Sequence, residues 1–127
     1  MAANTTPIFT LTPVIPVVQI ATANTNRDGT GTMGTLLTGA TDGTRVDAIK
    51  IKATGTTTAG TIRLFYYDGT NVRLIAEFPV NAITVSATVP AFEATIPMDI
   101  IVPSAKELRV STEKAETFNV FALGGAF

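Results

Sequence analysis

The chain contains neither cysteine nor histidine, so carboxylates, hydroxyls, lysines and tyrosines are the side chains available for chemistry. Zinc sites, thiol nucleophiles and the Ser-His-Asp triad are therefore excluded. Ser104 has Lys106 two residues away as a conceivable activating base. The segment Pro103-Ser104-Ala105-Lys106-Glu107 is, however, typical of a polar connection between strands. We expect no catalysis and no cofactor.

The acidic residues also favour structural roles. Asp-Gly-Thr occurs at 28–30, 42–44 and 68–70, where calcium would be the best-suited metal because it binds oxygen ligands. Asp-Gly is also the commonest hairpin-turn chemistry, and we interpret all three triplets as turns rather than a metal site. Glu93 and Asp99, six residues apart in one predicted strand, would lie about 20 Å apart. A glycosidase pair needs roughly 5–10 Å.

Tyr66 and Tyr67 are adjacent aromatic residues in a predicted strand. Successive strand side chains point to opposite faces, so only one of the two can be exposed on a given face. An exposed tyrosine would offer a stacking platform for a sugar or a base, whereas a buried one fills the core. We favour core filling and retain Tyr67 as a candidate interaction residue.

Composition indicates a protein that works by contact. The chain has 127 residues, is 46% apolar and 15% charged, carries net charge −1 and contains 23 threonines. Soluble domains usually carry about 25% charged residues, so we expect other subunits to cover part of this surface. Nucleic-acid binders usually carry an excess of positive charge, and this chain is nearly neutral. The sequence also contains no run of about 20 apolar residues, the length of a membrane helix. We therefore expect neither nucleic acid nor membrane as a partner.

Residues 1–16 are predicted to form an extended N-terminal arm. Pro7, Pro13 and Pro16 remove backbone donors and disfavour helix. The arm is apolar, so it should lie either on its own domain or on a neighbouring subunit. The candidate interaction residues are Ile8, Phe9, Leu11, Val14 and Ile15 of the arm, together with Tyr67 and the C-terminal Phe127. Phe121 and Leu123 extend the apolar contact surface predicted around Phe127.

Residues 17–127 alternate between apolar and polar side chains with a period of two, which predicts one antiparallel β-sandwich domain. We expect an all-β, jelly-roll-like fold of about eight strands. Candidate strands cover residues 17–21, 32–38, 45–54, 61–67, 72–78, 82–89, 92–100, 108–113 and 117–123.

Asp68-Gly69 marks the clearest hairpin turn. One face of that hairpin is predicted to carry Ile62, Leu64 and Tyr66, opposite Val72, Leu74, Ala76 and Phe78.

The region from Val46 to Phe127 resembles small structural proteins of tailed bacteriophage particles. The resemblance is carried by the hairpin at 67–71, the stretches 96–103 and 107–112, and the near-terminal Gly124-Gly125. It implies a jelly-roll decoration or cement subunit, made in the host bacterial cytoplasm and located in the virion. Its implied partners are further copies of itself, as a homotrimer, and a major capsid or other virion protein. No catalytic residues carry over.

The same resemblance also includes pieces of tail and head fibres. The alternative function is therefore a receptor- or carbohydrate-binding module, with Tyr66 or Tyr67 and the Asp-Gly-Thr loops as its contact surface.

Overall fold

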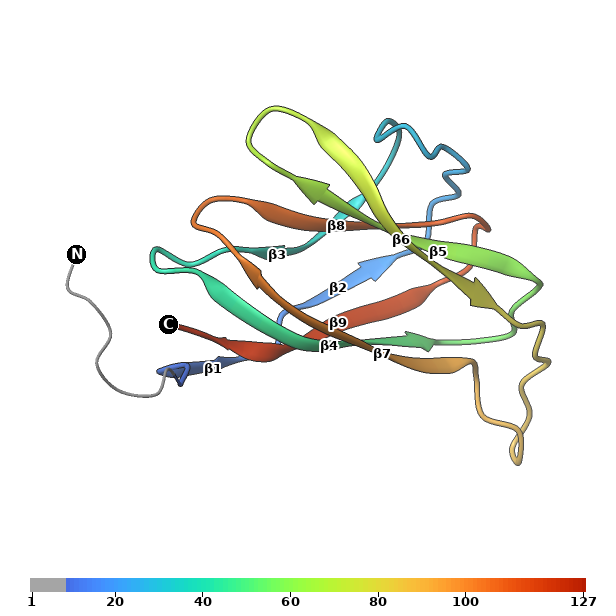
Figure 1. Cartoon of the computed structure of the whole chain (residues 1–127). Helices are drawn as coiled ribbons and strands as arrows, with labels where there is room; N and C mark the ends of the chain where they lie inside the picture. Colours follow the sequence, from blue (N-terminus) through green and yellow to red (C-terminus); the bar gives the residue numbers. More distant parts are fainter. Residues whose placement is uncertain (1–8) are drawn as a thin grey trace.

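Two antiparallel sheets pack face to face in the computed structural model, which describes residues 9–127 (Figure 1). In sheet A, β9 pairs with β1 and β2 on one side and with β4 on the other, and β4 pairs with β7. Sheet B has the order β3-β8-β5-β6. No helix occurs among the described residues. The strands are β1 (Thr12–Val14), β2 (Val17–Ile20), β3 (Gly34–Thr38), β4 (Thr44–Ala53), β5 (Gly60–Tyr67), β6 (Val72–Val80), β7 (Glu93–Val102), β8 (Glu107–Thr112) and β9 (Phe118–Ala126).

The strand order is that of a jelly roll. Apart from the short β1, sheet A reads β2-β9-β4-β7 and sheet B reads β3-β8-β5-β6, so each sheet combines strands from both ends of the chain. Two four-stranded antiparallel sheets connected in this way define the jelly-roll sandwich. The expectation of an all-β, jelly-roll-like sandwich is confirmed.

The core forms where the alternating apolar residues of both sheets meet. Ile49 and Ile51 of β4 are fully buried, as are Ile62 and Leu64 of β5. Phe118 belongs to the same cluster and comes from β9. Because every second residue of a strand points inward, the sequence alternation alone aligns these side chains between the sheets.

The N-terminal strand begins earlier than the predicted boundary at residues 16 and 17. Thr12–Val14 forms β1, in which Pro13 lies opposite Gly125 of β9. Proline is tolerated there because β1 lies at the edge of the sheet, where one side of a strand needs no backbone donor. The arm outside the sandwich is therefore residues 9–11 of the described chain, and the candidate Ile8 lies outside the described residues.

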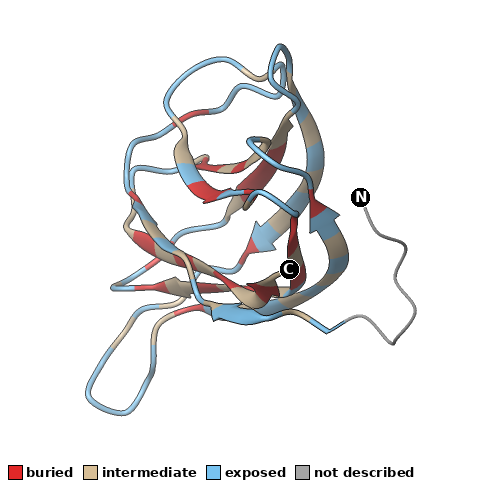
Figure 2. Cartoon of the chain, turned by 90° about the vertical axis from the view of Figure 1, so that its left-hand side faces the viewer, coloured by how far each residue is buried: buried red, intermediate tan, exposed pale blue. Residues whose placement is uncertain are grey.

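The predicted strand at 82–89 is wrong. Only Ile83 forms an isolated bridge, with Thr57. Farther along, the Ser86 hydroxyl accepts hydrogen bonds from the backbone N–H of Thr88 at 3.3 Å and of Val89 at 3.1 Å. A serine that binds its neighbours' backbone in this way favours a turn over a sheet ladder. The resulting loop projects beyond sheet A on the side away from the core (Figures 1 and 2).

The predicted inward face of the hairpin is only partly correct, because the β5–β6 register shifts between Leu64 and Phe65. Ala76 and Phe78 face the core as expected. Beyond the shift, Leu74 lies opposite Phe65 and Val72 lies opposite Tyr67, so both belong to the other face of the sheet. A bulge adds one residue to a single strand, and that reverses the facing of every residue after it.

Gly124 provides a test of close strand packing. A Cβ built there would collide with the backbone carbonyl of Arg45, whereas one built at Gly55 would meet nothing within 4 Å. We expect Gly124→Ala to destabilise the fold by about 1–3 kcal/mol, as overpacking does, and Gly55→Ala to leave stability nearly unchanged. Urea denaturation followed by circular dichroism measures both. Equal midpoints for the two variants would contradict the register of β4 and β9.

Candidate interaction surfaces

Part of the outer face of sheet B is covered by the chain itself. The connection between β2 and β3, residues 21–33, crosses this face, and the backbone N–H of Asn24 donates to the carbonyl of Thr112 at 2.8 Å. The buried Asn24 amide donates to the carbonyls of Thr30 and Thr32 at 3.0 and 2.9 Å and accepts from the N–H of Asn26. These hydrogen bonds hold the crossing segment in one conformation.

Arg63 is the charged centre of the contact between this segment and the sheet. Its side chain is 1% exposed, and its Nε and Nη2 lie 3.0 and 3.1 Å from the carboxylates of Glu77 and Glu113. Its Nη1 donates to the carbonyl of Asn24 at 3.4 Å. From the crossing segment, Arg27 reaches the same Glu77 oxygen, with Nε at 2.7 Å. We call these four charged residues the Arg63 cluster.

Contacts within the Arg63 cluster shift the pKa values of Glu77 and Arg27. The hydrogen bond from Arg27, supplemented by that from Arg63, lowers the pKa of the Glu77 carboxyl below its usual value. The same contact raises the pKa of Arg27. Both shifts favour the charged forms that join the crossing segment to sheet B. The segment is therefore attached most firmly when Glu77 is ionised.

Sheet A has an outer face on which apolar side chains remain exposed. Val17 and Ile101 are 60% and 54% exposed. The strand register aligns Val17 with Phe121 and aligns Ala48 with both Leu123 and Pro97. We call this surface the outer face of sheet A, and its apolar residues are Val17, Ala48, Pro97, Ile101, Phe121 and Leu123. Ile15, between β1 and β2, is 63% exposed.

Charged residues lie toward both ends of this face. At one end, Arg45 contacts Asp47, with Nε and Oδ1 2.7 Å apart, and also contacts Asp99. Asp99 adopts a left-handed backbone, φ 53°, within the irregular part of the β4–β7 pairing. At the other end, Lys52 lies 4.0 Å from Glu93 and donates to the carbonyl of Ala91 at 3.0 Å. Lys50 of β4 lies between the two ends, beside Phe121. A mainly apolar patch bordered by polar residues is the usual anatomy of a protein interface.

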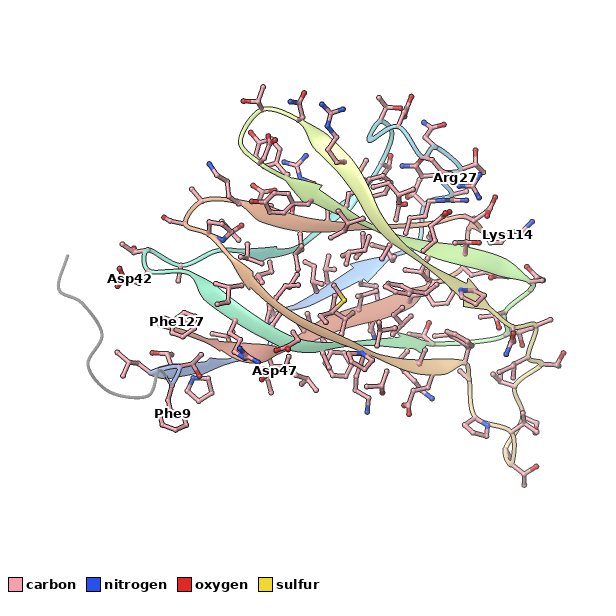
Figure 3. All side chains as sticks on the ribbon, in the orientation of Figure 1. Phe9, Arg27, Asp42, Asp47, Lys114 and Phe127 are labelled. Carbon is pink, nitrogen blue, oxygen red and sulfur yellow. The ribbon has the colours of Figure 1, made fainter. Side chains whose placement is uncertain are left out.

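The arm contributes a second exposed apolar surface at one end of the sandwich. Phe9 and Leu11 are 79% and 84% exposed. Figure 3 shows the Phe9 ring directed away from both sheets. The backbone N–H of Leu11 donates to the carbonyl of Ala126 at 2.8 Å, which fixes the point where the arm leaves the fold. Phe127 lies at the same end, half-buried, with its N–H donating to the carbonyl of Gly43 at 3.1 Å.

The remaining candidates from the sequence lie elsewhere. Val14 is half-buried and lines an apolar groove of about 310 Å³ between β1 and β3. Tyr67 is half-buried on sheet B; its hydroxyl donates to the carbonyl of Gly69 at 3.0 Å, and Arg109 lies 4.2 Å from its ring centre. Tyr67 pairs with Glu107 beside the β7–β8 turn, so it lies toward the same end as the arm but on sheet B. Phe9 and Phe127 lie at that end (Figure 3), where β1, with Val14, pairs with the end of β9.

Only some residues on the outer face of sheet A were candidates predicted from sequence. Phe121 and Leu123, both half-buried, belong to the apolar contact surface predicted near the C-terminus, whereas Val17 was interpreted as an ordinary strand residue. A signal existed in the run Val120-Phe121-Ala122-Leu123, which is apolar on both faces of its strand. Strands apolar on both faces are typical of sheets covered on both sides. The same applies to Ile100-Ile101 in β7.

The Asp-Gly-Thr triplets act as turns. Asp68 accepts hydrogen bonds from the N–H groups of Asn71 and Thr70 at 2.7 and 2.9 Å, which lower the pKa of its carboxyl. Asp28 accepts from the hydroxyl and the N–H of Thr30, which lower its pKa likewise. Residues 9–127 contain no group of three or more acidic, histidine or cysteine side chains placed to hold a metal ion. Within that range, no helix is long and apolar enough to cross a membrane.

Comparison of the chain with protein-family models and with curated proteins finds no match in either. The residues described above are therefore the basis for inferring what the chain does.

The Arg63 cluster predicts a specific pH dependence. Because the pKa of folded Glu77 is lowered, its contribution to stability is present above the unfolded carboxyl pKa and is lost as pH falls through the folded value. Glu77→Gln should lower the melting temperature most near pH 7. The difference in melting temperature between the variant and the wild type should decrease below about pH 4. Thermal melts at several pH values measure this.

Glu93→Gln is the matched control, since Glu93 lies 4.0 Å from Lys52 on an exposed surface. We expect it to change the melting temperature little at any pH, as exposed ion pairs contribute little. Equal effects of the two substitutions, or a Glu77→Gln deficit independent of pH, would contradict the assigned role of the cluster.

Proposed function

We propose that this chain is a structural subunit of a tailed-bacteriophage particle, a decoration or cement protein that attaches to the capsid. It acts by binding rather than by catalysis. Its arm and the loops beside the arm contact the major capsid protein or another virion protein. The observation that carries the proposal is the exposure of Phe9 and Leu11 at one end of a jelly-roll sandwich.

The arm suits attachment to another protein. Large apolar side chains that stay in water oppose solubility, and covering each one contributes about 1.5–3 kcal/mol. Leu11 makes the last backbone hydrogen bond to the sheet, to Ala126, and Phe9 lies beyond it, so both side chains project from a fixed point on the sandwich. A partner with an apolar groove can bury both without disturbing the fold.

The loops beside the arm form a connected platform. The N–H of Gly39 donates to the carbonyl of Lys106 at 2.8 Å, and the N–H of Ala105 donates to the carbonyl of Gly39 at 3.1 Å. These bonds join the β3–β4 connection to the β7–β8 turn at the end of the molecule from which the arm emerges (Figure 1). Loops fixed to each other lose little conformational freedom on binding, which favours affinity.

The charge balance supports attachment by many small contacts. The chain carries net charge −1, so long-range attraction to a partner contributes little. On a repeating shell, copies that each bind weakly reinforce one another through multivalency. The fibre-module alternative has less support, because the hydroxyl of Tyr67 and one side of its ring already contact Gly69 and Arg109.

The arm provides the test. The double variant Phe9→Ser/Leu11→Ser should keep its melting temperature and lose at least about tenfold in affinity for virus particles stripped of the native protein. Co-sedimentation with particles of the virus that encodes the chain measures the affinity. Ile75→Ser is the control, since Ile75 is an exposed apolar residue on β6, in the other sheet. Particle binding unchanged in the double variant, or absent from the wild-type protein, would overturn the proposal.

A further inference from the structure

We propose that the outer face of sheet A binds the same face of a second copy of this chain. The inference rests on the proposed function only in that it treats the chain as an assembly subunit. It concerns a surface different from the arm: the arm attaches the subunit to its shell, and the outer face of sheet A joins neighbouring copies.

The contrast between the two sheets identifies the face. On sheet B, the segment 21–33 and the Arg63 cluster cover part of the outer surface, and Phe65, which points to this side, is fully buried. On sheet A, Val17 and Ile101 remain more than half exposed. The chain thus covers part of one apolar sheet face with its own residues and leaves the other open to a partner.

The apolar part of the face is continuous across the sheet. Val17 of β2 lies beside Phe121 of β9, and Leu123 lies beside Ala48 of β4. Pro97 of β7 lies on the far side of Ala48. These residues occupy neighbouring rows of four adjacent strands, so a flat apolar surface of a partner can contact all of them at once.

The charges on the face favour a second copy over a strongly charged partner. Its cationic residues are Arg45, Lys50 and Lys52, and its carboxylates are Asp47, Glu93 and Asp99, so the face is neutral. One end carries the Arg45 contacts with Asp47 and Asp99, and the other carries the Lys52–Glu93 pair. With Lys50 on the Lys52 side, the Arg45 end has one cation and two carboxylates and the Lys52 end has two cations and one carboxylate. An identical face turned end for end therefore meets the opposite net charge at each end.

The area of the face indicates how tightly two copies associate. Four strands about 4.8 Å apart, over eight residues at about 3.3 Å each, cover roughly 500 Å² per copy. Two such faces bury about 1,000 Å² in total, near the lower bound for specific protein interfaces. Association in solution is therefore weak and depends on concentration, and neighbours held on a shell would be joined far more strongly.

Measuring mass against concentration tests the inference. By sedimentation equilibrium, the full-length protein should associate as its concentration rises toward about 1 mM. Val17→Asp should lower the association constant at least tenfold, because it places a charge beside Phe121 on the apolar part of the face. Ile75→Asp is the matched control: it makes the same change at an exposed apolar residue of β6 and should associate like wild type.

A cysteine variant keeps the test valid if Val17→Asp fails to fold. The chain has no cysteine, so Val17→Cys carries a single thiol, as does the control Ile75→Cys. Alkylation of the thiol should slow with rising protein concentration at position 17 and stay constant at position 75. Equal slowing at both positions would overturn the assigned face.

Other outcomes separate this inference from the proposed function. A wild-type protein that stays monomeric at about 1 mM and whose Val17→Asp variant loses particle binding would show that the face contacts the shell. That result overturns pairing between copies and supports the structural role. Association between copies without any particle binding would support the pairing and count against the proposed function.

Discussion

The guanidinium of Arg63 lies on the outer side of sheet B, yet it is almost completely removed from water. A buried cation is stable only when its hydrogen bonds are satisfied, and two carboxylates and the carbonyl of Asn24 satisfy them here. This requirement fixes the path of residues 21–33 across the sheet. The arrangement of the remaining surfaces follows, because a segment held over sheet B is not available to cover sheet A.

A two-layer sandwich buries only the inner faces of its sheets. Each outer face must be polar, covered by the same chain, or covered by another molecule. Here, sheet B is partly covered by its own chain. Sheet A is polar at its ends and apolar along Val17, Phe121 and Leu123. Only 15% of the residues are charged, so there are few charged side chains to make both outer faces hydrophilic. The scarcity of charge is therefore seen in the structure as the apolar part of the outer face of sheet A.

Much of the fold could be predicted from the sequence, because alternation over six to ten residues directly reports which side of a strand meets the core. Eight of the nine predicted strands correspond to observed ones. The failures involve signals that alternation does not contain. β1 was not predicted because it contains Pro13. The bulge beside Phe65 places Leu74 on the opposite face from the predicted one. The Ser86 turn lies in an apolar stretch that was predicted to be a strand. The burial of Arg63 was also missed, since it depends on a segment 39 residues away from it in sequence.

The arm and the outer face of sheet A differ in the kind of contact that each permits. Phe9 and Leu11 extend from a single anchor at Ala126, so they can enter a concave site whose shape differs from that of the sandwich. The sheet face spans four hydrogen-bonded strands, so it fits best against another broad surface. The proposed shell subunit would use the first kind of contact with the shell and the second between neighbours. Because they belong to separate parts of the chain, either can be weakened by substitution while the other remains intact.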